Sequence, residues 1–302
     1  MKKLIFICLL ASLTSLHGYA QYSMDFGVSL GASNYLGEIG GNTGEAKPFI
    51  MDMKLKQTSF GIGGFYRYNF TRSVAAKLTI NYARISGADS LSNEPTRIAR
   101  NLSFRTDLLE FSLLGEFTFF SFNDMSRRSK SRVDFSTYVT AGVGILMYYP
   151  YAQHDGKWYY LRPLATEGIE NVYDETAIVI PFGLGANFTF NRKMRLGFEM
   201  VYRFTNTDYL DDVSTDYAYD SELPFEESAI FANRSAEAYA RGNADLPNQD
   251  FYRPGARRGN PDGNDGYLFA QVSLSYYISK GNSFGRSRYK SVISRRKKRT
   301  KF

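Results

Sequence analysis

Eight segments of the chain alternate apolar with polar residues, and this pattern restricts the possible folds more than any other feature of the sequence. In residues 194–204, for example, the even positions hold Met, Leu, Phe, Met, Tyr and Phe, whereas Arg, Gly and Glu occupy most of the odd positions. Such alternation is typical of a β-strand whose two faces meet different surroundings. The segments cover residues 24–31, 60–70, 74–82, 109–119, 135–149, 180–190, 194–204 and 268–278.

The segment lengths and the connections between them favour a barrel in a membrane. Most segments exceed the ~5–6 residues usual for soluble strands, and a tilted membrane strand needs about 9–11. The connections alternate between short ones, at 71–73, 121–134 and 191–193, and long ones, at 37–58, 87–106, 150–177 and 207–266. Outer-membrane barrels combine an even strand count with short periplasmic turns and long outer loops.

We therefore predict an all-β fold: an eight-stranded antiparallel transmembrane β-barrel with short periplasmic turns, long extracellular loops and both termini in the periplasm. A soluble β-sandwich or lipocalin-like barrel would show the same alternation with its apolar face turned inward. Here the apolar face carries bulky Phe, Leu, Ile and Tyr, while the opposite face carries many Gly, Ser, Thr and Ala with isolated charges. Small residues suit the narrow lumen of an eight-stranded barrel, which favours the membrane barrel.

The two ends of the chain differ from its body. Two lysines precede an apolar run that ends in small residues, which predicts a signal peptide over residues 1–20. The single cysteine, Cys8, lies in it, so we expect no disulfide or thiolate site in the mature protein. Residues 281–302 hold nine Lys or Arg and no acid, whereas residues 21–280 hold 26 basic and 30 acidic residues. We interpret 21–280 as an outer-membrane barrel and 281–302 as a basic periplasmic tail.

Alternation also assigns charged side chains to the barrel interior. The interior of an eight-stranded barrel is just wide enough for side chains to fill, and buried charges are tolerated when they are paired. Four acids and four bases fall on the inward parity, a balance that predicts a salt-bridged plug rather than a conduction path. They are Asp25, Arg67, Lys77, Glu110, Glu116, Arg195, Glu199 and Arg203.

Residues suited to catalysis or metal binding are scarce. One histidine, His154, remains after the signal peptide, and Asp155-Gly156 beside it favours a turn. We expect a solvated loop histidine, no catalytic residue, no cofactor and no small-molecule substrate. We also predict no metal site. Weak candidates for Ca²⁺, which takes oxygen ligands, lie in an acidic loop that we expect to be solvated and whose spacing matches no EF-hand: Asp208, Asp211, Asp212 and Asp216.

The predicted periplasmic side is rich in cations. A polybasic surface can bind nucleic acid, anionic lipid or an acidic protein, and nucleic acid is not expected in the periplasm. The alternative is a disordered tail that only keeps the protein soluble. We expect a protein partner, bound by Arg72, Arg127, Arg128, Lys130, Arg132, Arg192, Lys193, Arg286, Arg288, Arg295, Arg296 and Lys297.

Three stretches carry a resemblance to a known family: residues 34–41 (NYLGEIGG), 204–217 with its DYLDDVS core, and 258–267 (RGNPDGNDGY). They resemble the PorG family of Bacteroidota, small outer-membrane barrels of the type IX secretion system. The resemblance implies a non-enzymatic barrel, embedded in outer-membrane lipid, that anchors the periplasmic ring of PorK and PorN. The chain departs from the family at Gly266, where a bulky aromatic residue is frequent.

Two other functions stay open from the sequence. A lipid-modifying enzyme on a small barrel would need a His-centred site at the outer rim. A passive barrel or adhesin resembling the OmpX type would have no use for a cationic periplasmic face.

Overall fold

The computed structural model describes residues 23–39, 57–122, 133–190, 193–242 and 246–279. The expected signal peptide and basic tail lie outside these residues. So do Arg192 and the cluster at 127–132 of the expected cationic side.

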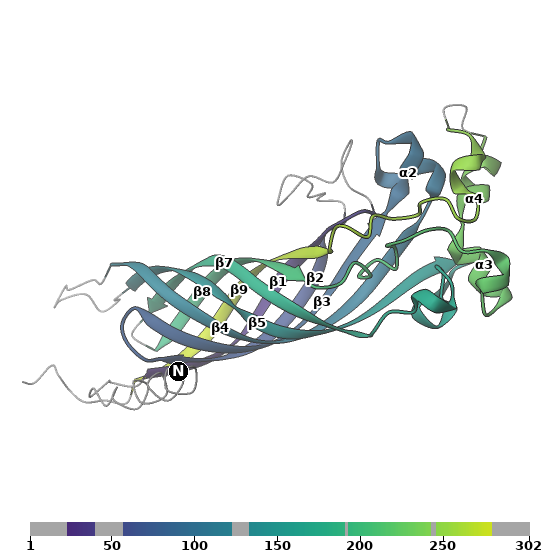
Figure 1. Cartoon of the computed structure of the whole chain (residues 1–302). Coiled ribbons are helices and arrows are strands. Elements are labelled where there is room, and N and C mark those ends of the chain that lie inside the picture. The colour runs from purple at the N-terminus through teal and green to yellow at the C-terminus, as the bar shows by residue number, and fades with distance from the viewer. Residues whose placement is uncertain (1–22, 40–56, 123–132, 191–192, 243–245, 280–302) are drawn as a thin grey trace, which may run out of the picture.

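Eight long antiparallel strands form one sheet that closes on itself (Figure 1). Consecutive long strands pair with each other, and β1 pairs with β9 to complete the ring. The predicted eight-stranded antiparallel barrel is therefore confirmed. The strands are β1 (Ser23–Leu36), β2 (Ser59–Asn69), β3 (Val74–Ala88), β4 (Ser103–Phe122), β5 (Val133–His154), β7 (Thr176–Phe190), β8 (Met194–Thr205) and β9 (Gly266–Ser279).

Side chains along each strand face alternately outward and into the lumen, as the alternation predicted. In β1, Val28 and Leu30 are 61% and 64% exposed, whereas Asp25 and Ser33 are fully buried. An apolar outer surface over a charged interior is the inverse of a soluble barrel. It suits a hydrocarbon environment, in which a closed ladder also satisfies the backbone hydrogen bonds of the strands. The fold is that of a transmembrane barrel, and the soluble alternative is wrong.

The strands reach further into the long connections than the sequence pattern predicted. Ala88 pairs with Ser103, inside the connection expected at 87–106. β5 likewise continues to His154. After a turn at Asp155-Gly156, the chain returns as a short additional strand, β6 (Lys157–Tyr160), which pairs with β5 outside the ring of eight. Both turn residues have positive φ, 49° and 76°, the geometry of a type I′ hairpin turn. The sequence predicted this turn but not the hairpin around it.

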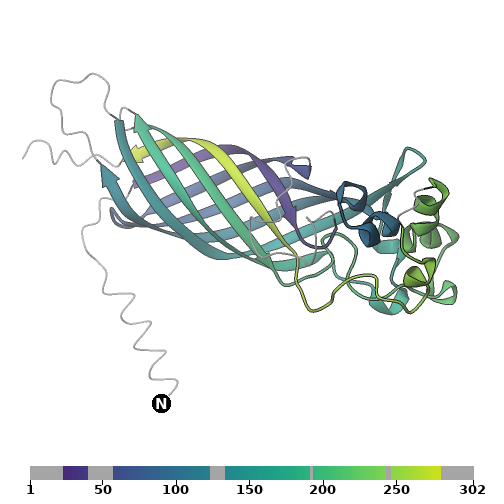
Figure 2. The same cartoon turned by 90° about the horizontal axis from the view of Figure 1, so that it is seen from above.

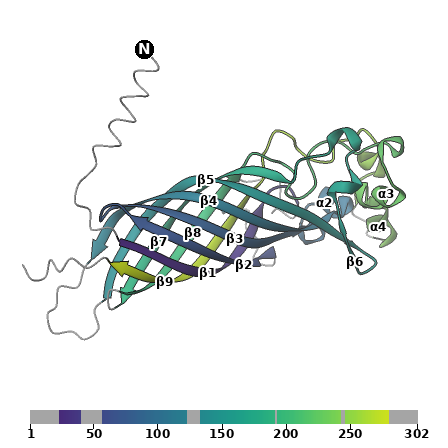
Figure 3. The same ribbon diagram turned by 90° about the horizontal axis from the view of Figure 1, so that it is seen from below.

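The long connections from β3 to β4, β5 to β7 and β8 to β9, where the structure describes them, fold into a cap over one end of the barrel, which we call the cap end (Figure 2). The other end, with the three short connections, is the short-turn end, where β1 begins and β9 finishes. Figure 3 shows that the β6 hairpin reaches toward the same region as α3 and α4. The cap holds α2 (Pro95–Arg100), α3 (Glu226–Ala232), α4 (Ser235–Ala240) and 3-10 helices at Asp89–Leu91, Arg162–Leu164, Ile169–Asn171, Asp220–Glu222 and Gln249–Tyr252. None of the helices in the described residues is long and apolar enough to span a membrane.

Candidate functional site

Six of the eight predicted lumen charges form one continuous chain of ion pairs. At its start, Oδ2 of Asp25 lies 2.9 Å from a guanidinium nitrogen of Arg67 and 3.1 Å from one of Arg195. Arg67 also donates a hydrogen bond of 3.0 Å to Glu116. Because these side chains come from β1, β2, β4 and β8, the pairs also cross-link strands that are not neighbours in the sheet.

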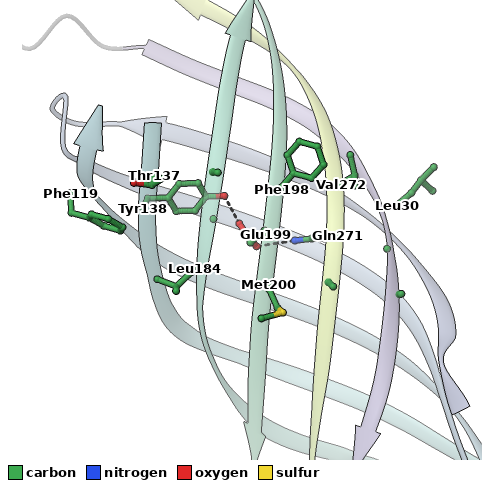
Figure 4. A pocket seen from close by; sticks show the side chains of 15 residues that line it. Leu30, Phe119, Thr137, Tyr138, Leu184, Phe198, Glu199, Met200, Gln271 and Val272 are labelled. Atoms are coloured by element: carbon green, nitrogen blue, oxygen red, sulfur yellow. Dashed lines mark hydrogen bonds between the residues drawn. The ribbon is translucent and has the colours of Figure 1, made fainter. Parts of the chain in front are cut away.

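Lys77 extends the chain of ion pairs. Its Nζ lies 3.2 Å from a carboxylate oxygen of Glu116 and 2.5 Å from one of Glu199. Glu199 accepts two further hydrogen bonds, from the Tyr138 hydroxyl at 2.7 Å and the Gln271 amide at 2.8 Å (Figure 4). One carboxylate in β8 is thus held by donors from β3, β5 and β9.

The remaining two lumen charges, Arg203 and Glu110, pair nearer the cap, with Nε and Oε2 2.5 Å apart. Glu110 also accepts hydrogen bonds from Tyr267 at 2.8 Å and Ser112 at 2.6 Å. The Arg203 guanidinium lies 5.1 Å from the ring centre of Phe269. All eight predicted lumen residues therefore lie in ion pairs inside the barrel, with equal numbers of positive and negative charges.

The outer wall around this network is apolar. The pocket drawn in Figure 4 is lined on its exposed side by Leu30, Leu184, Phe198, Met200 and Val272. Such side chains suit the hydrocarbon chains of lipid and lack the polar groups that orient a soluble ligand.

An apolar base of the cap enters the mouth of the barrel. Leu210 and Val213, from the connection between β8 and β9, are 0% and 1% exposed. They pack in one cluster with Tyr35 of β1 and Phe104 of β4. The Leu210 carbonyl accepts a hydrogen bond of 2.5 Å from the hydroxyl of Thr106. The base of the cap is therefore fixed to the strands beneath it.

The three stretches that carry the family resemblance meet beside this base. The hydroxyl oxygen of Tyr35, from the first stretch, lies 2.6 Å from Oδ2 of Asp211 in the second and 2.5 Å from Oδ1 of Asp265 in the third. The backbone amides of Val213 and Leu210 donate hydrogen bonds of 3.0 Å to Asp211 and Asp265, respectively. Segments far apart in the sequence thus build one polar cluster at the cap end of the lumen.

A second set of polar contacts links the second and third stretches to the connection between β5 and β7. Arg258, from the third stretch, lies 2.9 Å from Glu167 and 3.8 Å from Asp212. Asp212 also accepts hydrogen bonds of 2.6 Å from Thr166 and from Tyr173. Burial raises the pKa of Asp212 to about 6, although Arg258 lowers it.

The acidic loop is solvated only in part: Asp216 is exposed as we expected, but the first three acids are not. Asp208, Asp211 and Asp212 are 6%, 1% and 2% exposed, because the loop packs onto the barrel mouth. The calcium candidates also point to different partners: Asp211 to Tyr35, Asp212 to Arg258, whereas the backbone of Asp216 bridges to that of Arg257. Within the described ranges, no group of three or more His, Cys, Asp or Glu is placed to hold a metal ion.

Three buried acids of this region lie close enough for the charge of one to raise the pKa of another. Burial raises the pKa of Asp208 to about 8, and the charge of Asp211 adds to the increase. The pKa of Asp211 is also raised to about 8, mainly by burial. The hydrogen bond from Tyr35 opposes this increase, and the charge of Glu38 adds to it. The pKa of Asp265 is well above its ordinary value. Burial is the main cause, and the charges of Asp211 and Asp208 add to the increase.

His154 is not the freely solvated loop histidine that we expected. It ends β5 and pairs with Lys157 across the hairpin. Its ring lies 6.1 Å from that of Phe231, and its Nδ1 lies 3.7 Å from a carboxylate oxygen of Glu237. These contacts hold the ring against α3 and α4 at the cap surface.

Two of the expected partner-binding cations lie within the described residues. Arg72, in the connection between β2 and β3, and Lys193, between β7 and β8, are both exposed at the short-turn end. The other ten expected positions lie outside the described residues.

The closed barrel, its apolar wall and its paired lumen charges define a small transmembrane β-barrel of the outer-membrane type. The chain belongs to the DUF6089 family, described as a domain of unknown function, whose model matches residues 2–229. No curated protein matches the sequence.

Solved outer-membrane barrels resemble the chain at low identity. The N-terminal β-barrel domain of Pseudomonas aeruginosa OprF has 9% identity and a TM-score of 0.33, over 85% of this chain and 97% of that one. Ail of Yersinia pestis, in complex with sucrose octasulfate, has 9% identity and a TM-score of 0.32, over 84% and 99%. Neisserial surface protein A has 6% identity and a TM-score of 0.34, over 86% and 99%. Similarity at this level carries no argument about function.

Proposed function

We propose that this protein is a non-enzymatic outer-membrane component of a type IX protein secretion machinery, which anchors a periplasmic ring of the PorK and PorN type. In this proposal the short-turn end and both termini face the periplasm and the cap faces outward. The observation that carries the proposal is the difference between the two ends. The cap end is covered and fixed to the strands, while the short-turn end exposes Arg72 and Lys193.

The sequence adds to this cationic end. Residues 127–132 and the tail 281–302 contribute most of the basic residues expected there. A surface of this charge suits an acidic protein partner. The resemblance to the PorG family supports the same assignment, and the three stretches that carry it meet in one cluster of the cap.

The two alternatives have weaker support. A lipid-modifying enzyme would need His154 beside a nucleophile, and the histidine is instead packed against Phe231 and Glu237. A passive barrel would give no role to the cations of the short-turn end.

The test replaces cations as a group, because an exposed ion pair contributes only ~0–1 kcal/mol. One variant changes Arg72, Arg127, Arg128, Lys130, Arg132 and Lys193 to Ala, and a second deletes residues 281–302. We expect at least one of them to insert as a barrel, lose co-purification with the ring proteins from solubilised membranes, and reduce secretion. Salt should weaken the wild-type contact, because exposed charges are screened beyond about 8 Å at physiological ionic strength.

A matched control removes charge from the opposite end of the barrel. Lys157 and Arg253 are exposed in the cap, and their replacement by Ala should leave the ring bound. The proposal is wrong if the wild-type barrel does not co-purify with the ring at low salt. Electrostatic docking is wrong if both variants and their combination retain the ring and secrete normally.

A further inference from the structure

The Tyr35 hydroxyl has one hydrogen and two close carboxylate neighbours. Its oxygen lies 2.6 Å from Asp211 and 2.5 Å from Asp265. A hydroxyl donates one hydrogen bond, whereas an ionised carboxylate can only accept. The second short contact therefore requires a hydrogen on one of the two carboxyl groups. With the cap closed, Asp211 or Asp265 is a neutral carboxylic acid.

Asp208 is a further buried acid without a hydrogen-bond donor. It is 6% exposed, and neither of its carboxylate oxygens accepts a hydrogen bond within the described part of the chain. The hydroxyl of Ser214 faces it and lowers its pKa, without hydrogen-bond geometry. Burying an ionised carboxylate without a partner is so costly that such a group becomes neutral instead.

The groups that face these three carboxyls offer little compensating charge. Arg100 of α2 faces Asp211, but its guanidinium already binds both carboxylate oxygens of Asp89, at 2.8 and 3.0 Å. Among the residues that the structure describes, the other groups whose charges interact most strongly with the cluster, besides Tyr35, are acidic or phenolic: Glu38, Tyr148, Glu167 and Tyr202.

We propose that Asp208, Asp211 and Asp265 form a proton-operated latch, which holds the connection between β8 and β9 on the barrel mouth while protonated and releases it when the protons leave. The latch joins Tyr35 at the end of β1 and Asp265 at the start of β9 to the loop between them. This loop carries Leu210 and Val213, the apolar base of the cap. The latch concerns the cap and does not rest on the proposed ring-anchoring function.

The direction of the pH dependence follows from linkage. In an open, solvated loop these carboxyls would have a pKa of about 3.9, whereas in the closed cap burial raises the pKa of Asp208 and Asp211 to about 8. Closure therefore takes up protons. Its contribution is fully present below about pH 4 and is lost as the pH rises through about 8. Between these limits each proton taken up changes the closing equilibrium about tenfold per pH unit.

Gly37 provides a mechanical probe of the same contact. A Cβ atom at this position would collide with the hydroxyl of Tyr35 and with Oδ1 of Asp265. Gly37→Ala should therefore separate Tyr35 from Asp265 and open the loop at low pH, where the wild-type latch is closed.

Hydrogen exchange on the whole barrel in detergent micelles tests the latch. The amides of Leu210 and Val213 donate to latch carboxylates, so their opening equilibrium, corrected for intrinsic exchange, reports closure. In the wild type we expect opening to increase at least about a hundredfold per pH unit between roughly pH 5 and pH 8 and then to level off, because at least two protons leave when the loop opens. Asp208→Asn and Asp211→Asn should reduce this slope, because an amide does not ionise.

A matched control changes a cap carboxyl outside the latch. Glu175 is 40% exposed and pairs with Arg162, so Glu175→Gln should keep the wild-type slope. A retained mobility shift on heating identifies the variants that fold. If Asp211→Asn does not fold, the Asp208→Asn variant still tests the latch, because the Asp208 carboxyl accepts no hydrogen bond that the substitution would remove.

Two results would overturn the latch: wild-type opening that is independent of pH, or folded Asn variants that keep the full slope. Exchange measured with calcium chloride and with EDTA tests whether the three carboxyls bind a calcium ion instead of protons. If calcium closes the loop above pH 8 and EDTA opens it at every pH, the cluster is a cation site and the proton latch is wrong. If calcium has no effect while the pH slope persists, the latch is supported.

Discussion

Charged residues in the lumen are tolerated because each has partners on other strands. Lys77 of β3 lies between Glu116 of β4 and Glu199 of β8, and its side chain is 3% exposed. Removing one member of such a buried set leaves the others uncompensated, which costs about 3–5 kcal/mol. Each lumen charge therefore stabilises the barrel only together with its partners. A substitution that neutralises one of them should lower the free energy of unfolding, although it changes the net charge by only one.

Lys77→Met should accordingly lower the free energy of unfolding by about 3–5 kcal/mol, because Glu116 and Glu199 lose their shared cation. Urea denaturation of the barrel in micelles measures this loss. Arg84→Ala is the control, since the Arg84–Asp107 pair is 29% and 23% exposed and should contribute only ~0–1 kcal/mol. Equal losses for the two variants would contradict the buried network.

His154→Ala separates the anchor from the enzyme alternative. The ring contacts Phe231 and lies near Glu237 in the cap, so its removal should leave lipid composition, growth and secretion unchanged. Mass spectrometry of outer-membrane lipids is the measurement. A changed lipid A or phospholipid profile would revive the enzyme hypothesis.

Single residues also show where sequence reasoning succeeds and where it stops. Asp25 and Glu199 could be assigned to the lumen because alternation places them opposite bulky apolar residues. Tyr35 continues the inward parity of β1, so extending the pattern past Gly31 would have found it. Asp211 gives no such signal, because its burial depends on where a long loop meets the barrel, and local sequence does not encode that contact.

Side chains from neighbouring strands determine at which positions only glycine fits. Gly185 of β7 lies under the ring of Tyr138 from β5, and a Cβ atom there would collide with Cζ and the hydroxyl. This placement lets the Tyr138 hydroxyl reach Glu199. Gly266 gives a similar reason for the departure from the PorG pattern: the Tyr202 side chain of β8 already occupies the space that a larger residue would need.

Gly185→Ala should destabilise the barrel by about 1–3 kcal/mol, the usual cost of overpacking, because Tyr138 must leave its place or strain the β5–β7 contact. Gly115→Ala is a matched control on the outward face, where the nearest atom to a Cβ would be 3.7 Å away. Urea midpoints of the two variants give the comparison. A Gly185 variant as stable as the Gly115 variant would show that the ring can move freely.

Among the secondary-structure elements, all eight long strands were predictable and the cap was not. Strand alternation is a local signal, whereas α3 and α4 are only seven and six residues long and too short to show a helical period. Strand ends were also underestimated: near the cap, outward positions hold polar residues such as Arg84 and Asp107, which pair with each other, and inward positions hold apolar residues such as Ile85. Ala88 and Ser103, which pair at the far end of β3 and β4, illustrate this limit.

At the scale of the whole molecule, the lumen is filled in two layers. One is the ion-pair chain from Arg195 to Glu199, and the other is the Arg203–Glu110 pair beneath the apolar base of the cap. The interior of an eight-stranded barrel has room for little more than side chains. An opened cap would therefore expose a plugged barrel, and the proton latch would control access to the cap surfaces rather than a pore.

The plug leads to a prediction for the intact protein in a planar bilayer. Because charges of both signs are paired across the lumen, an ion entering it would have to displace an ion pair, and breaking a buried pair costs about 3–5 kcal/mol. We expect no steady conductance either at about pH 5, where the latch is closed, or at about pH 9, where it is open. The heat-dependent mobility shift verifies that the reconstituted protein is folded. A stable open channel at both pH values would contradict the plug, and a channel that opens only at high pH would show that the cap, and not the ion-pair network, seals the lumen.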